Sequence, residues 1–499
     1  MKIKTLALAL LFFPIFLSAQ DMRAPLEKKN FSEPTNYSDL AEYVNSLQNK
    51  SPLLKTEVIG NTSNGKNIYA LQFSKSTFGK DKSKTKVLIF AQQHGNEQSG
   101  KEGALLLISD LLKPENQYLF DKIDVALVPQ VNADGAELNQ RRNGHNADLN
   151  RNHLIMEEPE VIALHKFFDK YLFEVTMDVH EYSPFSSEVW RKFGYRTNSD
   201  ELIGVNTNCN IPLEMRDFAN NSFVPFYREY LTKRQISNSI YAPGGPPEMD
   251  YIRHSTFDIN DGRQSFGIQN TFSTIQEGLN GEDNFKDRIK QRAVGQKTGM
   301  RALLEFVYQN SSKLKTMVAQ NRLSLLNSKQ GETYSIQMEH VKTGKTHPLP
   351  VYSYATGKDS VIIVKDYRPL VKSIYDIKTP AGYLIPKNIP ELVQWSKRQN
   401  VKTSSLKDGK YQLEQYNIVA VDSMDFEGDI IVNPRIETSR LKEKLQLSEY
   451  IFIPINQLKK GLIIGALEPK SELGLVTYSG YKHLLKAGGK FPILRVIKK

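Results

Sequence analysis

Short apolar runs separated by polar turns divide the first part of the chain into alternating strands and helices. Three nearly continuous apolar runs, at residues 87–91, 123–131 and 173–179, have the pattern of strands that are buried on both faces of a parallel or mixed sheet. Apolar residues at helical spacing predict amphipathic helices at residues 36–48 and 160–171. This alternation favours an α/β fold.

The strand at residues 87–91 leads into a loop that carries two candidate metal ligands. His94 and Glu97 follow this strand, and a glycine-rich segment then leads into an apolar, helix-length pattern at residues 104–112. In open α/β sheets, ligands bind at loops at the carboxyl ends of strands. A three-residue spacing lets an imidazole and a carboxylate bind one ion if the turn is helical. Taken alone, this pair is more typical of a solvated loop, so further ligands are needed.

The second part of the chain changes character. A helix at residues 287–309 and a second helical stretch at 312–327 lead into a region of short apolar and aromatic runs between glycine and proline turns. One helix, at residues 389–400 with Pro390 in its first turn, interrupts this region. We expect a mostly β domain whose strands include YSIQMEH (334–340), SVIIVKDY (360–367), QYNIVAVD (415–422), EYIFIPI (449–455) and LGLVTYS (473–479).

Chain length and the first residues indicate the domain organisation. A chain of 499 residues exceeds what one hydrophobic core usually supports. Lys2 and Lys4, followed by an apolar stretch and a plausible cleavage point, predict a secretory signal peptide. We therefore predict a signal peptide at residues 1–20, an α/β domain at 21–328 and a smaller, mostly β accessory domain at 329–499.

The first residues, the cysteine count and the charge limit the compartments and partners that are possible. The signal peptide predicts a periplasmic or secreted protein, and no later segment reaches the roughly 18 apolar residues of a membrane span. Cys209 is the only cysteine, so no intramolecular disulfide can form. The formal net charge is +11, but the lysines are scattered and form no concentrated stripe. We therefore expect no nucleic-acid partner and no transmembrane segment in the mature chain.

Residues whose side chains could act in catalysis or binding are concentrated in six short motifs: HGNE (94–97), NADG (132–135), RRNGHNADLNRN (141–152), DVHEYS (178–183), IYAPGG (240–245) and FSTIQE (272–277). Each motif is modest alone, but six in order over roughly residues 35–310 form a strong signal. On these motifs the chain resembles the zinc carboxypeptidases, the family that includes pancreatic carboxypeptidases A and B. The resemblance implies a mixed central sheet flanked by helices, followed here by the smaller β domain.

A third metal ligand is available in the DVHEYS motif. A catalytic zinc typically takes three protein ligands and leaves a fourth position for water, and two His plus one Glu is an established set. His180 follows the strand at 173–179, so it would lie at the same sheet edge as His94. We therefore predict one zinc ion held by His94, Glu97 and His180. Asp148 would hydrogen-bond the distal nitrogen of a ligating imidazole, and the resemblance assigns it to His94.

The resemblance also implies which groups act on a peptide. Glu277 matches the family's general base and acid, and Arg141 matches its oxyanion-stabilising arginine. Asn150 and Arg151 match the pair that holds the terminal carboxylate of the substrate, a task that suits a planar guanidinium. Tyr241 matches the mobile tyrosine that closes over bound substrate. The plain alternative is that Glu277 and the arginines are solvated surface charges.

Side-chain preference stays open. Tyr182 is expected to line the next subsite. The segment at residues 246–270 is longer than in the pancreatic members and covers the region that sets side-chain preference in the family. Met249 would favour an apolar pocket there and Glu248 a basic one.

Together these assignments predict zinc-dependent hydrolysis of C-terminal residues from peptides, through a metal-activated water and with Glu277 as general base and acid. Two alternatives stay open: a peptidase of cell-wall stem peptides, and a non-catalytic envelope-binding protein whose peptidase domain is a relic. The retained ligands, arginines and Glu277 argue against the relic. The expected partners are peptide or protein C-termini, with peptidoglycan peptides as the alternative.

Overall fold

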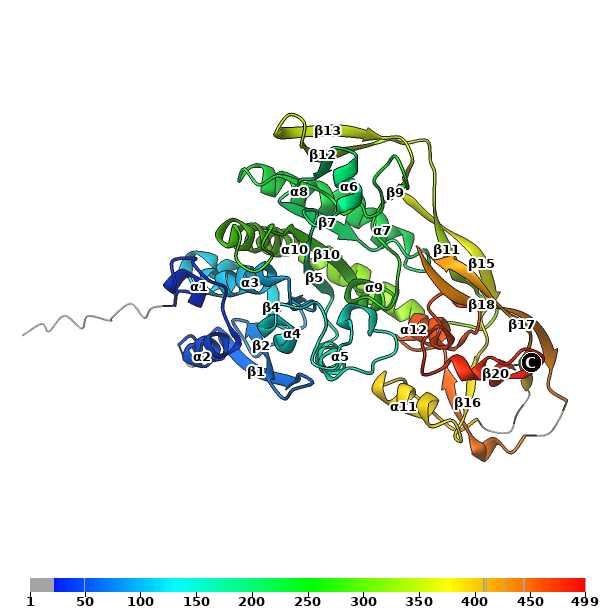
Figure 1. The fold of residues 1–499 in the computed structure, drawn as a ribbon. Helices are drawn as coiled ribbons and strands as arrows, with labels where there is room; N and C mark the ends of the chain where they lie inside the picture. The colour runs from blue at the N-terminus through cyan, green and yellow to red at the C-terminus, as the bar shows by residue number, and fades with distance from the viewer. Residues whose placement is uncertain are drawn as a thin grey trace, which may run out of the picture.

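The computed structural model has a large mixed sheet at its centre and a second, smaller sheet near the C-terminus (Figure 1). Among the described residues, no helix combines the length and the apolar character needed to cross a membrane. The predicted signal peptide at 1–20 lies outside the described residues. The structure describes residues 22–48, 50–406, 409, 411–426, 428–442 and 445–498.

The central sheet has eight strands and confirms the expected mixed α/β fold. Four neighbouring strands, β4, β3, β5 and β10, run parallel to one another, while β2 and β7 join them from either side in antiparallel pairing. The strands, in spatial order, are β1 (Leu54–Asn61), β2 (Asn67–Phe73), β4 (Ile123–Val128), β3 (Thr85–Ala91), β5 (Val175–Tyr182), β10 (Phe272–Leu279), β7 (Glu201–Val205) and β8 (Asn238–Ile240).

Helices cover both faces of this sheet. Successive side chains of a strand point to opposite faces, so a strand that is apolar throughout needs cover on both sides. On β3, Val87 and Ile89 belong to the core that includes residues of α2, α3 and α10, whereas Leu88 and Phe90 belong to the core beneath α5. This arrangement explains the continuous apolar run of β3. The covering helices are α2 (Tyr37–Leu47), α3 (Gln98–Leu111), α5 (Pro159–Tyr171) and α10 (Ile289–Leu326).

Two helix boundaries differ from the prediction. A single helix, α10, replaces the two stretches expected at 287–309 and 312–327; Asn310 alone departs from helical geometry (φ −114°, ψ 15°), and its side chain bonds the carbonyl of Phe306. α3 begins at Gln98 rather than at residue 104. Its glycines do not loosen the chain, because they allow close packing of the helix on its neighbours.

Gly103 is the clearest case of such packing. A Cβ atom at this position would lie 2.6 Å from Cβ of Gln296 and 2.8 Å from the backbone nitrogen of Lys297, both on α10. We expect Gly103→Ala to destabilise the fold by about 1 to 3 kcal/mol, because a helix backbone cannot move aside cheaply. Urea unfolding of the variant and of Gly480→Ala measures this. Gly480 is exposed, and a Cβ atom there would have no neighbour within 4 Å, so its change should stay within about 0.5 kcal/mol; equal losses in both variants would contradict the packing argument.

The C-terminal region is mostly β, as expected, and its predicted helix is α11 (Pro390–Arg398). The run LGLVTYS was predicted wrongly as a strand: residues Leu475–Thr477 form a 3₁₀ turn whose apolar side chains are buried. A short apolar run does not distinguish a strand from a buried turn. The other elements of the region are β11 (Thr333–Val341), β12 (His347–Ser353), β13 (Lys358–Val364), β14 (Tyr367–Arg368), β15 (Leu370–Lys378), β16 (Gly382–Pro386), β17 (Tyr411–Phe426), β18 (Asp429–Arg440), β19 (Tyr450–Pro454), α12 (Lys460–Leu467) and β20 (Lys490–Lys498).

Strands of the C-terminal region pair with strands that precede residue 329. β12 pairs antiparallel with β6 (Tyr195–Thr197), and β14 pairs parallel with β9 (Ile252–Arg253). One buried core contains residues from both parts of the chain. The division at residues 328 and 329 stays a prediction. The remaining helices are α1 (Pro25–Lys28), α4 (Ala133–Glu137), α6 (Glu188–Lys192), α7 (Leu213–Phe218), α8 (Val224–Thr232) and α9 (Gly262–Gly267).

Candidate active site

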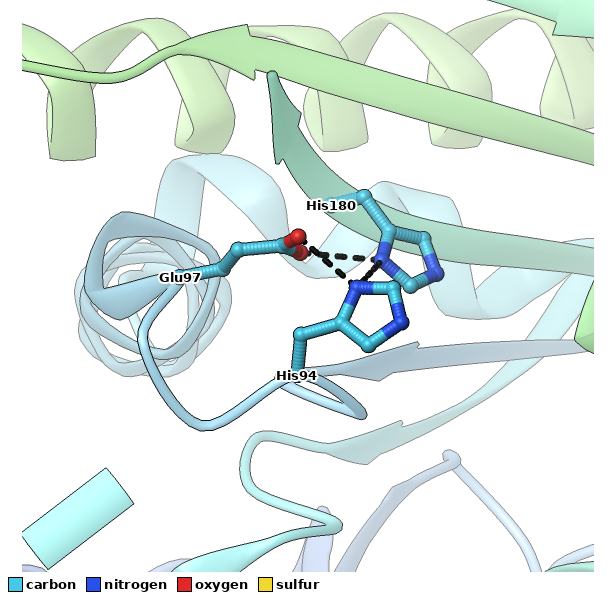
Figure 2. A group of neighbouring side chains, drawn as sticks. All are labelled: His94, Glu97 and His180. Carbon is cyan, nitrogen blue, oxygen red and sulfur yellow. Dashed lines mark hydrogen bonds and ion pairs between the residues drawn. The ribbon is translucent and has the colours of Figure 1, made fainter. Parts of the chain in front are cut away.

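His94, Glu97 and His180 converge at the carboxyl ends of β3 and β5 (Figure 2). Nδ1 of His94 lies 2.7 Å from Oε1 of Glu97, and Nδ1 of His180 lies 2.9 Å from Oε2 of the same carboxylate. The two Nδ1 atoms are 3.1 Å apart. All three side chains are buried. In the part of the chain that the structure describes, this is the one group of His, Cys, Asp and Glu residues with the spacing of a metal site.

The loop that presents His94 and Glu97 is held by close backbone packing. The backbone N–H of Glu97 bonds the carbonyl of His94 at 3.2 Å, so the turn brings both side chains to one side. A Cβ atom on Gly95 would lie 2.1 Å from the carbonyl carbon of Gly135 in the NADG motif. The HGNE and NADG motifs therefore pack against each other, and this contact explains why both carry glycine.

Paired strands place Glu277 beside His180. β10 and β5 run parallel, and Glu277 lies directly opposite His180 in their register. Residues in register on neighbouring strands point to the same side of a sheet. Both residues lie within their strands rather than just after them, because β5 runs to Tyr182 and β10 to Leu279.

Carboxylates bind the outer nitrogens of both imidazoles. Nε2 of His94 lies 3.2 Å from Oδ1 of Asp148, and Nε2 of His180 lies 2.9 Å from Oδ1 of Asp178. A carboxylate only accepts, so each Nε2 would donate to its carboxylate, and a cation bound at this group would take the lone pairs of the two Nδ1 atoms. The contact of Asp148 with His94 is the one that the resemblance implied.

Asp178 was missed in the sequence analysis. It stands two residues before His180 on β5, and side chains two apart on a strand share a face. The signal was therefore present in the DVHEYS motif. Asn150 adds a second neighbour, since its Nδ2 lies 3.2 Å from Nε2 of His180.

The charges of this group fit a divalent cation. Burial raises the pKa of Glu97, but the imidazoles of His94 and His180 outweigh burial and hold it well below its usual range. Burial lowers the pKa of His180, but Asp178 and Glu97 outweigh burial and raise it well above its usual range. Three carboxylates thus surround two imidazoles whose Nδ1 atoms face one another. Such a set of donors suits zinc.

The remaining predicted residues lie around one cleft of about 600 Å³ beside this group. His94 and Glu97 line the cleft, together with Leu349 and Pro350 of β12 in the C-terminal region. The sequence predicted that six further residues act on the peptide or bind it, and the structure brings all of them to the same cleft. They are Glu277, Arg141, Asn150, Arg151, Tyr182 and Tyr241.

Glu277 is an unusual carboxylate because it is only 8% exposed. Burial raises its pKa to about 8, and the carboxylates of Glu97 and Asp178 act in the same direction. A divalent cation at the neighbouring group would lower this pKa, because a nearby positive charge favours the ionised form.

Arg141 and Asn150 are oriented by the residues around the candidate metal group. Nε of Arg141 donates to Oδ2 of Asp148 at 2.9 Å, and Nη1 of Arg141 lies 3.2 Å from Nδ1 of His94. Oδ1 of Asn150 accepts from the backbone N–H of Gly262 at 2.8 Å. Arg141 therefore lies beside the candidate metal group.

Tyr182 and Tyr241 both line the cleft. The hydroxyl of Tyr182 donates to the carbonyl of Ser199 at 2.6 Å and accepts its N–H at 2.9 Å, so the Tyr182 hydroxyl is already engaged. Tyr241 directly follows β8, and its ring lies 5.9 Å from the guanidinium of Arg263. Burial raises the pKa of Tyr241, so its hydroxyl stays protonated.

Neither residue considered for side-chain preference lines the cleft. Met249 is 68% exposed, and Glu248 accepts from the hydroxyl of Tyr195 at 2.5 Å. Four other residues of the segment 246–270 line the cleft instead. They are Thr256, Asp258, Asp261 and Arg263. Because this segment departs from the family pattern, the motifs did not point to these four.

Comparison of the sequence with known protein families gives a match that contains the candidate metal ligands. Residues 40–241 match the model of the zinc carboxypeptidase family, a range that contains His94, Glu97 and His180. This range is a zinc carboxypeptidase domain. The match to this family is the one that the motifs predicted. Glu277 lies beyond the matched range, so its assignment rests on its position beside His180.

Several named proteins are similar to this chain. Carboxypeptidase 2 from Trichophyton tonsurans is 23% identical over 442 residues, which cover 85% of this chain and 79% of that protein. Carboxypeptidase D from Homo sapiens is 23% identical over 266 residues, which cover 47% of this chain and 19% of that protein. A solved metallo-carboxypeptidase from Burkholderia cenocepacia is 17% identical, with a TM-score of 0.44 over 56% of this chain and 70% of that one.

Proposed function

We propose that the protein hydrolyses the C-terminal residue of peptides in a zinc-dependent reaction. The observation that carries this proposal is the meeting, in one cleft, of a His–Glu–His donor group, a buried glutamate and an arginine–asparagine pair. The first two suit hydrolysis at a metal, and the pair suits recognition of a free carboxylate.

Zinc would be held by Nδ1 of His94, Nδ1 of His180 and the carboxylate of Glu97. When bound, zinc supplies a Lewis acid that polarises a carbonyl and lowers the pKa of water. Asp148 and Asp178 keep the two imidazoles in the tautomer that binds a cation, because they accept a hydrogen bond from each Nε2.

The chain's own residues then divide the work on the peptide. The Glu277 carboxylate accepts a proton from the attacking water and delivers it to the departing amine. Arg141 donates hydrogen bonds to the oxyanion that develops on the scissile carbonyl. Asn150 and Arg151 bind the terminal carboxylate, which sets the cleavage one residue from the end, and Tyr241 covers the bound residue.

Recognition of the free carboxylate gives the test of this function. We expect a peptide with a free C-terminus to be cleaved at least about 100-fold faster than its C-terminal amide, because the amide leaves the charge of Arg151 unpaired. Arg151→Met should remove most of this difference by slowing cleavage of the free peptide. Mass spectrometry of the products over time measures both rates.

Arg142→Met is the matched control, since Arg142 is exposed and outside the lining of the cleft. It should keep the wild-type preference. Equal cleavage of free and amidated peptides by the wild type would instead indicate an endopeptidase. Turnover of stem peptides alone would favour the cell wall as the substrate.

We also propose that the chain is exported. The proposal rests on the charged start, apolar stretch and cleavage point within residues 1–20. N-terminal sequencing of the protein from the culture medium and from a periplasmic extract tests it: a mature chain that begins near residue 21 is expected, and an intact Met1 would contradict export.

A further inference from the structure

The loop at residues 152–156 connects α5 to Asn150 and Arg151, the two residues proposed to bind the terminal carboxylate of the substrate. Asn150 and Arg151 end a short 3₁₀ turn (Leu149–Arg151), and α5 begins at Pro159. No strand or helix includes residues 152–156. Since these residues are buried, their backbone carbonyls need partners from elsewhere in the protein.

Those partners come from the C-terminal end of α11. Nε1 of Trp395 donates to the carbonyl of Leu154 at 2.9 Å. Nε2 of Gln399 donates to the carbonyls of His153 and Leu154 at 3.0 and 2.9 Å. Nη2 of Arg398 adds a longer contact of 3.3 Å to the carbonyl of Ile155. Side chains at the C-terminal end of α11 thus bind three successive backbone carbonyls in the loop that follows Asn150 and Arg151.

α11 is itself fixed to the catalytic part of the chain. Asp169 on α5 accepts from Nδ2 of Asn400 at 3.1 Å and from Nζ of Lys459 at 2.8 Å. Trp395 is fully buried and Gln399 is inaccessible to solvent. The helix end therefore cannot move away from the loop without breaking buried contacts.

The opposite side of the loop is held by the segment that lines the cleft. The N–H of His153 donates to the carbonyl of Asn260 at 3.1 Å, and Nδ2 of Asn260 lies 3.2 Å from the hydroxyl of Tyr478 in the C-terminal region. The N–H of Gly262 binds Oδ1 of Asn150. A continuous set of hydrogen bonds thus links the C-terminal region to the residue pair that faces the substrate.

We propose that Trp395 and Gln399 are positioning residues for the substrate carboxylate, so that the C-terminal region forms part of the binding site. They touch no substrate and act by fixing the backbone from which Asn150 and Arg151 project. The inference rests on the proposed carboxypeptidase function for its kinetic readout. Loss of either donor would let the loop shift, which weakens binding of the free C-terminus more than the chemical step.

Two variants test this role. Gln399→Met keeps the volume and removes both N–H donors, and Trp395→Phe removes the indole N–H. Gln394→Met makes the same change at an exposed position of the same helix and is the matched control. We expect KM for a free peptide to rise roughly 3- to 30-fold in the two variants, with kcat within about twofold of wild type and unchanged zinc content. The control should keep the wild-type KM.

Amide hydrogen exchange followed by mass spectrometry gives a readout that is independent of activity. Peptides that cover residues 150–156 should exchange faster in Gln399→Met and Trp395→Phe than in wild type and in Gln394→Met. If wild type cleaves no peptide, the proposed function fails and this measurement still decides the positioning of the loop.

Two results would overturn the inference. One is an unchanged KM together with unchanged exchange at residues 150–156. The other is a fall in kcat, zinc content and exchange protection across the whole molecule, which would show a general structural role instead. A rise in KM that is confined to the two variants, with faster exchange confined to the loop, supports it.

Discussion

Glu277→Gln will leave the fold and the zinc content intact and will slow peptide hydrolysis by at least about 10²- to 10⁴-fold. Glutamine has the size of glutamate and can still form hydrogen bonds, so the buried position tolerates it. It cannot accept a proton from water, which is the role proposed for Glu277. Substrate binding should survive, because Arg151 and the metal group are unchanged.

Initial rates with a free peptide, metal content and thermal unfolding of the same preparations measure this prediction. Glu248→Gln is the matched control, since Glu248 lies on the exposed surface near the cleft without lining it. A variant at Glu277 that stays nearly as active as wild type would assign the proton transfer to another group. Glu181 also lines the cleft and is the alternative, but both its carboxylate oxygens bind Arg292, at 2.9 and 3.0 Å.

His180→Ala should lower the zinc content from about one ion per chain to near none and abolish activity. Only His94 and Glu97 remain as donors in this variant, and a catalytic zinc site typically needs three protein ligands. The variant also removes the imidazole beside the buried carboxylate of Asp178, which then keeps only the donor of Gln93 among the described residues, so we expect a lower unfolding temperature as well.

Elemental analysis of dialysed protein checks the loss of zinc. His145→Ala is the control, because His145 is exposed, bonds Glu158 and lies outside the metal group. Its zinc content should equal that of wild type. Full retention of zinc in His180→Ala would remove His180 from the site and leave the third ligand to be found.

The sequence by itself determined the features that depend on local patterns. The run at 87–91 indicated a buried strand because apolar residues on both faces need cover on both sides. The six motifs in order named several residues that line the cleft, among them His94, Arg141 and Glu277. Asp178 was within reach of the same reasoning, because two-residue spacing on a strand places it beside His180.

Local pattern failed where packing partners decide the conformation. Glycines before residue 104 suggested a loose segment, but Gly103 lies within α3. Glycine is needed there because α10 packs too closely for a larger side chain. Two helical stretches were expected at 287–309 and 312–327, but buried residues on both sides of Asn310 keep α10 continuous. The apolar run at 473–479 suggested a strand, but it has no strand partner and forms a buried turn.

Only the tertiary structure decided what surrounds the substrate. Thr256, Asp258, Asp261 and Arg263 reach the cleft through a segment that no motif marks. The bond from Gln399 to His153 joins residues 246 positions apart in the chain. Sequence periodicity reports which face of an element is apolar, but it carries no information on which distant element covers that face. Contacts of this kind follow from the assembly of the whole core, because each one depends on where all the other elements have packed.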